Sequence, residues 1–199
     1  DNIYTLSSID AKHLSALEDL CNFVGIIIEN MRLFDNIEKI GQTDFLTGIY
    51  NRRVGIELIN KLIENTNESL NPFTLCYVDL NGLKIVNDTK GHNVGDQMIR
   101  DLVDLMKSVV RPGDILSRIG GDEFIILFPD CKMEGAEAAW QRILDEMEVF
   151  NKGEDKPYRL RASHGIAVYN PDSNMTATRL LAIADKRMYK EKTRMNART

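Results

Sequence analysis

The sequence predicts an α/β sandwich, in which helices flank a central sheet, and three observations support this fold class. Two β-prone runs, at 115–119 and 124–128, are separated by a double-glycine turn and predict a hairpin. An apolar run at 73–79 predicts a buried strand, and alternating residues at 158–169 predict another. Helical periodicity recurs in the segments that would cover this sheet, at 94–110, 135–150 and 176–193.

Length and composition suit one globular domain with an appendage. The chain has 199 residues, which is enough to bury one sizeable core. Its net charge of −5 predicts no broad basic surface for nucleic acid or anionic lipid. The cysteines Cys21, Cys76 and Cys131 form no Cys-x-x-Cys pair and predict neither disulfides nor a zinc site. Without a signal peptide or an apolar run near the ~18 residues of a membrane span, we expect a cytoplasmic protein with no membrane segment.

Residues 1–40 have a helical character of their own. Apolar residues follow a 3-4-3-4-3 spacing, namely Leu17, Leu20, Val24, Ile27, Met31 and Phe34. Two interpretations stay open: the seam of a short coiled coil that forms a dimer contact, or an amphipathic helix packed on its own domain. Because the chain does not begin with methionine, we expect it to be part of a longer protein, with this helix as a stalk.

A second helix is expected after the segment 44–53. Thr47 or Asp44 can cap its start, and apolar residues then continue at helical spacing, namely Ile56, Ile59 and Ile63. We expect this segment to join the stalk to the domain, and we assign it no chemistry.

The buried strand at 73–79 ends in a carboxylate, Asp79. A carboxylate at a strand end is well placed to hold a metal ion over the edge of a sheet. Gly82 then allows backbone amides to approach a phosphate closely, and Lys84 adds a positive charge. Taken by itself, Lys84 is more typical of a surface lysine.

The segment 87–96 contains several turn formers, and we expect a polar loop that leads into the helix at 94–110. A second interpretation is recognition of a purine base. A carboxylate pairs with the donor edge of guanine, and an amide can pair with either edge. The residue types of this segment permit both interpretations.

The turn of the predicted hairpin is the most informative motif in the chain. Gly120 and Gly121 are expected to form a tight turn through positive φ, and Asp122 and Glu123 follow at once. With Asp79 from a neighbouring strand end, these carboxylates would complete an all-oxygen site of the kind that suits Mg²⁺ held against phosphates. Taken alone, the turn is more typical of a solvated acidic bend.

Three further features have structural interpretations from sequence alone. The segment 111–114 reads Arg-Pro-Gly-Asp and is typical of a helix end with a surface ion pair. Trp140 is expected in the core, and His164 is expected to be structural. The last helix ends in a basic cluster.

The string Gly-Gly-Asp-Glu-Phe at 120–124, with Asp79 upstream, resembles the GGDEF family of diguanylate cyclases, which is named for this turn. Further segments match the family between about residues 44 and 192. The resemblance implies a nucleotide-cyclase-like fold with a mostly antiparallel central sheet over residues 41–199. The segments 8–10 and 28–34 resemble the last helix of a GAF sensor domain, so residues 1–40 would be its truncated C-terminal helix, below an upstream sensor.

The resemblance also implies a set of site residues at the matching positions. Mg²⁺ or Mn²⁺ would be bound by Asp79, the Leu80 carbonyl, Asp122 and Glu123, of which the last two also serve catalysis. GTP would be bound by Gly82, Leu83, Lys84, Asn87, His92, Asp96 and Lys192. Cyclic di-GMP would bind an inhibitory site made of Arg111, Asp114 and Arg142.

The function implied is a diguanylate cyclase that condenses two GTP into cyclic di-GMP and two pyrophosphates across a homodimer, with feedback inhibition by the product. Asp96 favours GTP as the only substrate, because a branch of the family that makes mixed GMP–AMP dinucleotides has serine there. The alternative is a catalytically inactive GGDEF domain that binds GTP or cyclic di-GMP as a sensor. Asn81 and Asn196 depart from the family pattern, and Arg194 is a candidate substitute for the phosphate-contacting arginine expected at 196.

Overall fold

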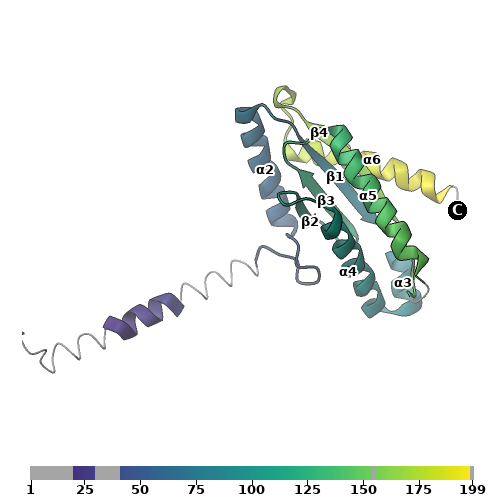
Figure 1. Ribbon diagram of the computed structural model, residues 1–199, viewed down its shortest axis with the longest axis horizontal. Helices are drawn as coiled ribbons and strands as arrows, with labels where there is room; N and C mark the ends of the chain where they lie inside the picture. Colours follow the sequence, from purple (N-terminus) through teal and green to yellow (C-terminus); the bar gives the residue numbers. More distant parts are fainter. Residues whose placement is uncertain (1–19, 30–40, 154–155, 198–199) are drawn as a thin grey trace, which may run out of the picture. The chain divides into compact units, whose positions relative to one another are not determined.

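A computed structural model describes residues 20–29, 41–153 and 156–197 (Figure 1). The chain divides into two units, Asp1–Gly41 and Gln42–Thr199, and each is described by itself. In the first unit, residues 20–29 are helical, and the seam residues Leu20, Val24 and Ile27 are exposed. The remaining seam residues lie outside the described residues, so both interpretations of the stalk stay predictions. Over the described ranges, no helix has the length and apolarity that a membrane crossing needs.

The second unit is built on an antiparallel sheet, as predicted. Within the described residues its strands are β1 (Phe73–Leu80), β2 (Ile115–Arg118), β3 (Glu123–Phe128) and β4 (Ala162–Tyr169), in the order β2-β3-β1-β4. The hairpin prediction is confirmed, because β2 and β3 pair directly, and β1 lies between β3 and β4. All residues of β1 are buried, as its central position requires.

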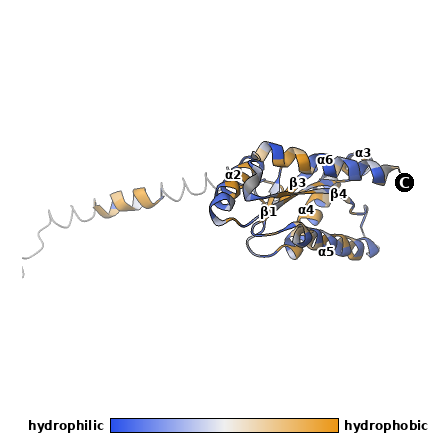
Figure 2. Cartoon of the chain, turned by 90° about the horizontal axis from the view of Figure 1, so that it is seen from above, coloured by the Kyte–Doolittle hydropathy of each residue, from blue (hydrophilic) through white to orange (hydrophobic). Residues whose placement is uncertain are grey.

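Helices cover both faces of the sheet. The four long ones are α2 (Arg52–Ser69), α4 (His92–Val109), α5 (Met133–Lys152) and α6 (Ala177–Asn196), with the shorter α3 (Leu83–Lys90) and the 3₁₀ turn η1 (Pro171–Ser173). Leu75 and Tyr77 of β1 pack with α2 and α6, whereas Cys76 and Val78 pack with α4 and α5. Figure 2 shows the strands between α6 on one side and α4 and α5 on the other. The α+β sandwich is therefore confirmed.

The start of α2 differs from the prediction. Asn51 is its cap, and the Asn51 side chain accepts a hydrogen bond from the Val54 N–H at 3.1 Å. The predicted caps close the preceding turn instead, where the Thr47 hydroxyl donates to the Asp44 carboxylate at 2.7 Å. The helix therefore begins about one turn later than the predicted caps, at Arg52.

The start of the last strand also differs. β4 begins at Ala162 rather than at residue 158, because the Asn151 side chain satisfies the preceding backbone. Its amide accepts from the Leu160 N–H and donates to the Leu160 carbonyl, both at 2.7 Å. A side chain thus occupies the position that a neighbouring strand would otherwise take.

The segment after β1 is where the prediction was wrong. Residues 87–90, expected in a polar loop, belong to α3, and Gly91 alone separates α3 from α4. Gly91 has a φ of 89°, in the left-handed region that favours glycine. Leu83 and Val86 pack against the core, which stabilises a helix in a stretch where local propensity favours turns.

Candidate active site

The site is built around two carboxylates that the sheet places opposite each other. Asp79, near the end of β1, is the register partner of Glu123, the first residue of β3. The Leu80 N–H donates a 2.8 Å hydrogen bond to the Asp122 carbonyl, which fixes the acidic turn against the end of β1. Residues more than forty positions apart in sequence are thereby brought together where the two central strands end.

The two glycines of the turn do not act as the sequence suggested. Neither Gly120 nor Gly121 is among the described glycines with positive φ, so the predicted reason for them was wrong. Gly120 is needed for space: a Cβ there would lie 2.5 Å from Glu123 Oε2. The Glu123 side chain therefore lies directly over Gly120, and its position depends on the absence of a side chain there.

Lys192 of α6 completes the contact at Asp79. Its Nζ donates to both Asp79 carboxylate oxygens, at 2.7 and 2.8 Å. The Asp79 side chain is 7% exposed and that of Lys192 is 32% exposed. Burial raises the pKa of Asp79 above its ordinary range; the Lys192 ammonium acts in the opposite direction, and the charges of Asp122 and Asp185 raise the pKa further.

Two residues near this site were not predicted as functional. Tyr77 lies two positions before Asp79 on the same face of β1, and Asp185 lies two turns before Lys192 on α6. Burial raises the pKa of the Tyr77 phenol, and the negative charges of Glu123 and Asp185 raise it further. The period of two along the strand and the i, i+7 spacing along the helix were the signals that could have identified both residues.

The donor set of this edge suits a hard divalent cation. Carboxylate oxygens are the ligands that Mg²⁺ prefers, and burial of Asp79 among further acidic groups leaves negative charge that one ammonium only partly offsets. Among residues 20–29, 41–153 and 156–197, no three acidic, histidine or cysteine side chains are already arranged as a cation site. The ligands suited to such an ion are the carboxylates of Asp79, Asp122 and Glu123, and in this structure Lys192 is bonded to the first of them.

The predicted base-binding residues lie on the hairpin of α3 and α4. Gly95, in the first turn of α4, is buried beneath Asn87: a Cβ on Gly95 would lie 1.9 Å from Asn87 Oδ1. This close approach brings the Asn87 amide beside the backbone that carries Asp96. His92 is the exposed first residue of α4.

The predicted phosphate-binding residues lie at the start of α3. Gly82 precedes the helix with a φ of 83°, a backbone conformation that L side chains rarely adopt. Leu83 and Lys84 form the first turn, where the backbone N–H groups of a helix are free to bind an anion. The structure thus places these residues directly after β1, whose end carries Asp79.

Arg118 links the acidic turn to the segment before α2, a connection that the sequence did not reveal. Its Nη1 lies 3.0 Å from Asp44 Oδ1, while its Nη2 and Nε donate to the Gly121 and Gly120 carbonyls at 2.7 and 3.1 Å. Burial acts to raise the pKa of Asp44, but hydrogen bonds from Thr47 and Arg118 outweigh it and hold that pKa below its usual range. The segment assigned no chemistry is thus linked, through Arg118, to the turn that carries Asp122 and Glu123.

The predicted inhibitory residues lie near the start of β2 and on α5. Arg111 and Asp114 form an ion pair with Nε and Oδ1 2.9 Å apart, in which the arginine is 56% exposed and the aspartate 4%. Asp114 also accepts from the Arg111 backbone N–H. Arg142 is exposed on α5.

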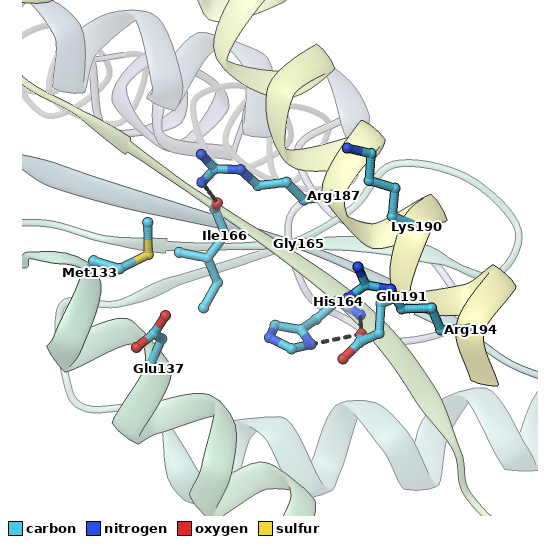
Figure 3. Close-up of a pocket in the computed structure, with 9 residues that line it drawn as sticks. All are labelled: Met133, Glu137, His164, Gly165, Ile166, Arg187, Lys190, Glu191 and Arg194. Carbon is cyan, nitrogen blue, oxygen red and sulfur yellow. Dashed lines mark hydrogen bonds and ion pairs between the residues drawn. The ribbon is translucent and has the colours of Figure 1, made fainter.

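A hollow of about 340 Å³ lies between α5, β4 and α6, and Figure 3 shows the residues that line it. His164 stacks on Trp140 with ring centroids 4.4 Å apart, and its Nδ1 lies 2.8 Å from Glu191 Oε2. These contacts hold the His164 ring in place, and its structural role stays a prediction; Trp140 is buried in the core as predicted. Arg194 lines this hollow rather than accompanying Lys192 at Asp79.

Comparison with known proteins identifies the family of the chain. Residues 41–198 match the family described as diguanylate cyclase, GGDEF domain. The chain is 30% identical over 192 residues to the probable diguanylate cyclase DgcE of Escherichia coli, covering 96% of the chain but 17% of that protein. It is 33% identical over 165 residues to the uncharacterized protein YhcK of Bacillus subtilis, covering 80% of the chain and 45% of that protein. The chain thus spans less than half of each of these relatives.

Solved structures agree on the fold. The diguanylate cyclase SiaD of Pseudomonas aeruginosa, in complex with its activator SiaC, superposes with a TM-score of 0.73 at 26% identity, covering 92% of this chain and 70% of SiaD. The coiled coil and GGDEF domain of DgcB from Caulobacter crescentus, in complex with c-di-GMP, gives 0.83 at 22% identity, covering 90% and 95%. The family match starts at residue 41, so the GAF-like assignment of residues 1–40 stays a prediction. With this match over most of its length and the acidic turn paired to Asp79, the chain belongs to the GGDEF domain family of diguanylate cyclases.

Proposed function

We propose that the chain is an active diguanylate cyclase, which condenses two GTP into cyclic di-GMP and two pyrophosphates. The observation that carries this proposal is the intact acidic turn, with Glu123 opposite Asp79 and with Lys192 on the same carboxylate. An inactive relative would be expected to have lost part of this arrangement. The nearby α3–α4 hairpin adds residues that suit a guanine nucleotide.

In this proposal each protomer holds one GTP. The Asp96 carboxylate accepts hydrogen bonds from the N1–H and N2–H₂ donors of guanine, and the Asn87 amide and His92 complete the base pocket. The backbone N–H groups of Gly82 and Leu83 face the triphosphate at the start of α3, with Lys84 and Lys192 as cations. The bound GTP would therefore lie with its base against the α3–α4 hairpin and its phosphates near the end of β1.

The reaction is a nucleotidyl transfer. The 3′-hydroxyl of one GTP attacks the α-phosphorus of the GTP on the partner protomer; the new O3′–P bond forms as the bond to pyrophosphate breaks. Asp122 or Glu123 accepts the hydroxyl proton. A divalent ion, Mg²⁺ or Mn²⁺, would be held by Asp79, the Leu80 carbonyl, Asp122 and Glu123, and when bound would neutralise charge on the phosphates. A second transfer of the same kind closes the ring.

A homodimer is part of the proposal, because one site cannot hold both reacting nucleotides. The exposed apolar side chains at Leu20, Val24 and Ile27 suit a helix that pairs with a second copy. Such pairing would raise the effective concentration of two facing domains. We further propose that cyclic di-GMP inhibits the enzyme at Arg111, Asp114 and Arg142, where a guanidinium can bind phosphate or the acceptor edge of guanine.

The test is to incubate the purified chain with GTP and Mg²⁺, with ATP as a parallel substrate, and to identify the products by mass. Cyclic di-GMP from GTP alone supports the proposal and the role of Asp96. The second candidate, a GTP or cyclic di-GMP binding module without catalysis, is motivated by Asn196 at the position of the family arginine. Tight guanine-nucleotide binding with no product would favour that module.

A further inference from the structure

Lys192 carries an inference that rests on the proposed function and concerns how its site is assembled. We propose that Lys192 occupies the cation position at Asp79 while no nucleotide is bound, and that its release makes metal binding and nucleotide binding depend on each other. The lysine would then be a positioning residue with two successive partners, first the carboxylate and then a phosphate.

The geometry of the contact supports this role. The Lys192 ammonium bonds both carboxylate oxygens of Asp79, at 2.7 and 2.8 Å, so it covers the two atoms that a metal ion would use. Asp79 is 7% exposed, which leaves little of the carboxylate for a second ligand. A cation can therefore bind Asp79 fully only after the ammonium has moved.

The surrounding charge favours such an exchange. Asp79 feels the negative charges of Asp122 and Asp185 as well as the positive charge of Lys192. One ammonium therefore does not neutralise these three carboxylates. A divalent ion would neutralise more of this charge, but it would repel an ammonium that stayed on the same carboxylate. Lys192 is 32% exposed and has a flexible four-carbon stem, so its ammonium can leave Asp79 without movement of α6.

A triphosphate supplies the ammonium with a new partner. Once Lys192 is held by a phosphate, Asp79 is free for the ion, and the ion in turn releases Lys192 for the phosphate. By thermodynamic linkage each ligand then raises the affinity of the other by the same factor. Without nucleotide, the ion has to compete with Lys192 for Asp79, so the affinity of the site for the ion is lower.

The experiment is calorimetric titration of the nucleotide-free chain with Mn²⁺, for the wild type and for Lys192→Met. We expect the variant to bind Mn²⁺ at least about fivefold more tightly, because an exposed ion pair already reaches about this factor and the Asp79 side chain is only 7% exposed. Lys190→Met is the matched control. It removes the same charge from an exposed residue of α6 that lines the neighbouring hollow and does not contact Asp79. It should leave the Mn²⁺ affinity unchanged. Lys192→Gln keeps an amide NH₂ donor group without the charge. It replaces Lys192→Met if that variant proves unstable, and it should also bind Mn²⁺ more tightly than the wild type.

The second readout is the coupling itself. A non-hydrolysable GTP analogue should raise the Mn²⁺ affinity of the wild type by a larger factor than it raises that of Lys192→Met. Equal Mn²⁺ affinities in the wild type and both Lys192 variants, or no Mn²⁺ binding to any of them, would overturn the inference. Product formation from GTP is measured separately, so a chain that makes cyclic di-GMP but shows no affinity difference refutes the inference alone. A chain that shows the difference but makes no product refutes the proposed function alone.

Discussion

Gly120 offers a sharp test of how the acidic turn works, because its missing side chain makes room for Glu123. A Cβ at position 120 would lie 2.5 Å from Glu123 Oε2, whereas ordinary contact begins at 3.4 Å. Gly120→Ala therefore displaces the carboxylate oxygen by about 1 Å, and a misplacement of that size at a catalytic group costs about 100-fold in rate. We expect kcat to fall by about this factor.

The fold should tolerate the same substitution. The φ of Gly120 is not in the left-handed region, so alanine can adopt the backbone of the turn. At such a position the change from glycine to alanine restricts the unfolded chain and stabilises a protein by about 0.4–1 kcal/mol, which the displaced side chain partly offsets. We expect a thermal unfolding midpoint equal to that of the wild type or slightly higher.

The assay is the initial rate of cyclic di-GMP formation at saturating GTP, with thermal unfolding measured on the same samples. Gly153→Ala is the control, since Gly153 follows α5 with a φ of −65° and has no part in the site. Its Cβ would lie 3.3 Å from the Phe150 carbonyl oxygen, so its stability is measured alongside, and kcat should stay unaltered. A wild-type kcat in Gly120→Ala would refute the reasoning that Gly120 positions Glu123.

Four further outcomes are expected. Asp79→Ala should abolish synthesis while the circular dichroism spectrum stays native, and retained activity would remove Asp79 from the site. Arg111→Ala should weaken inhibition by cyclic di-GMP, measured as a higher inhibition constant; an unchanged constant would contradict the proposed inhibitory site. Deleting residues 1–40 should lower the specific activity at low protein concentration, and equal specific activity on dilution would show that the stalk has no role. Asp44 has a folded pKa below the unfolded value of about 3.9, because Thr47 and Arg118 bond its carboxylate; these contacts stabilise the chain above that value, and their contribution is lost as pH falls through the folded pKa. Asp44→Asn should therefore flatten the acid side of the stability profile, and an unchanged profile in urea unfolding would count against these contacts.

The sequence predicted the strands and the turn that carry the site, because their signals are local. An apolar run that ends in Asp79 and a hairpin that bends at Gly120 are both visible in a short window. The pairing of Asp79 with Glu123 is not local, since it depends on which strands become neighbours in the sheet. The contact between Lys192 and Asp79, across 113 residues, is likewise a product of how α6 packs on β1.

The errors have physical reasons of the same kind. Residues 87–90 are good turn formers, and they are helical because Leu83 and Val86 have a core to pack against. The glycines of the acidic turn suggested positive φ, whereas Gly120 provides space for a side chain three positions later. The sequence does not predict the role of Arg118, because its partners, Asp44 and the turn carbonyls, come together only in the folded chain.

The central claim is that Glu123, Asp79 and Lys192 form the working site of a cyclase. The measurement that tests it most directly is mass analysis of the products that the wild type and Glu123→Gln make from GTP and Mg²⁺, with GTP binding measured for both. We predict cyclic di-GMP and pyrophosphate from the wild type, and neither from a variant that still binds GTP. Equal product from both proteins, or none from a wild type that binds GTP and forms dimers, would contradict the account.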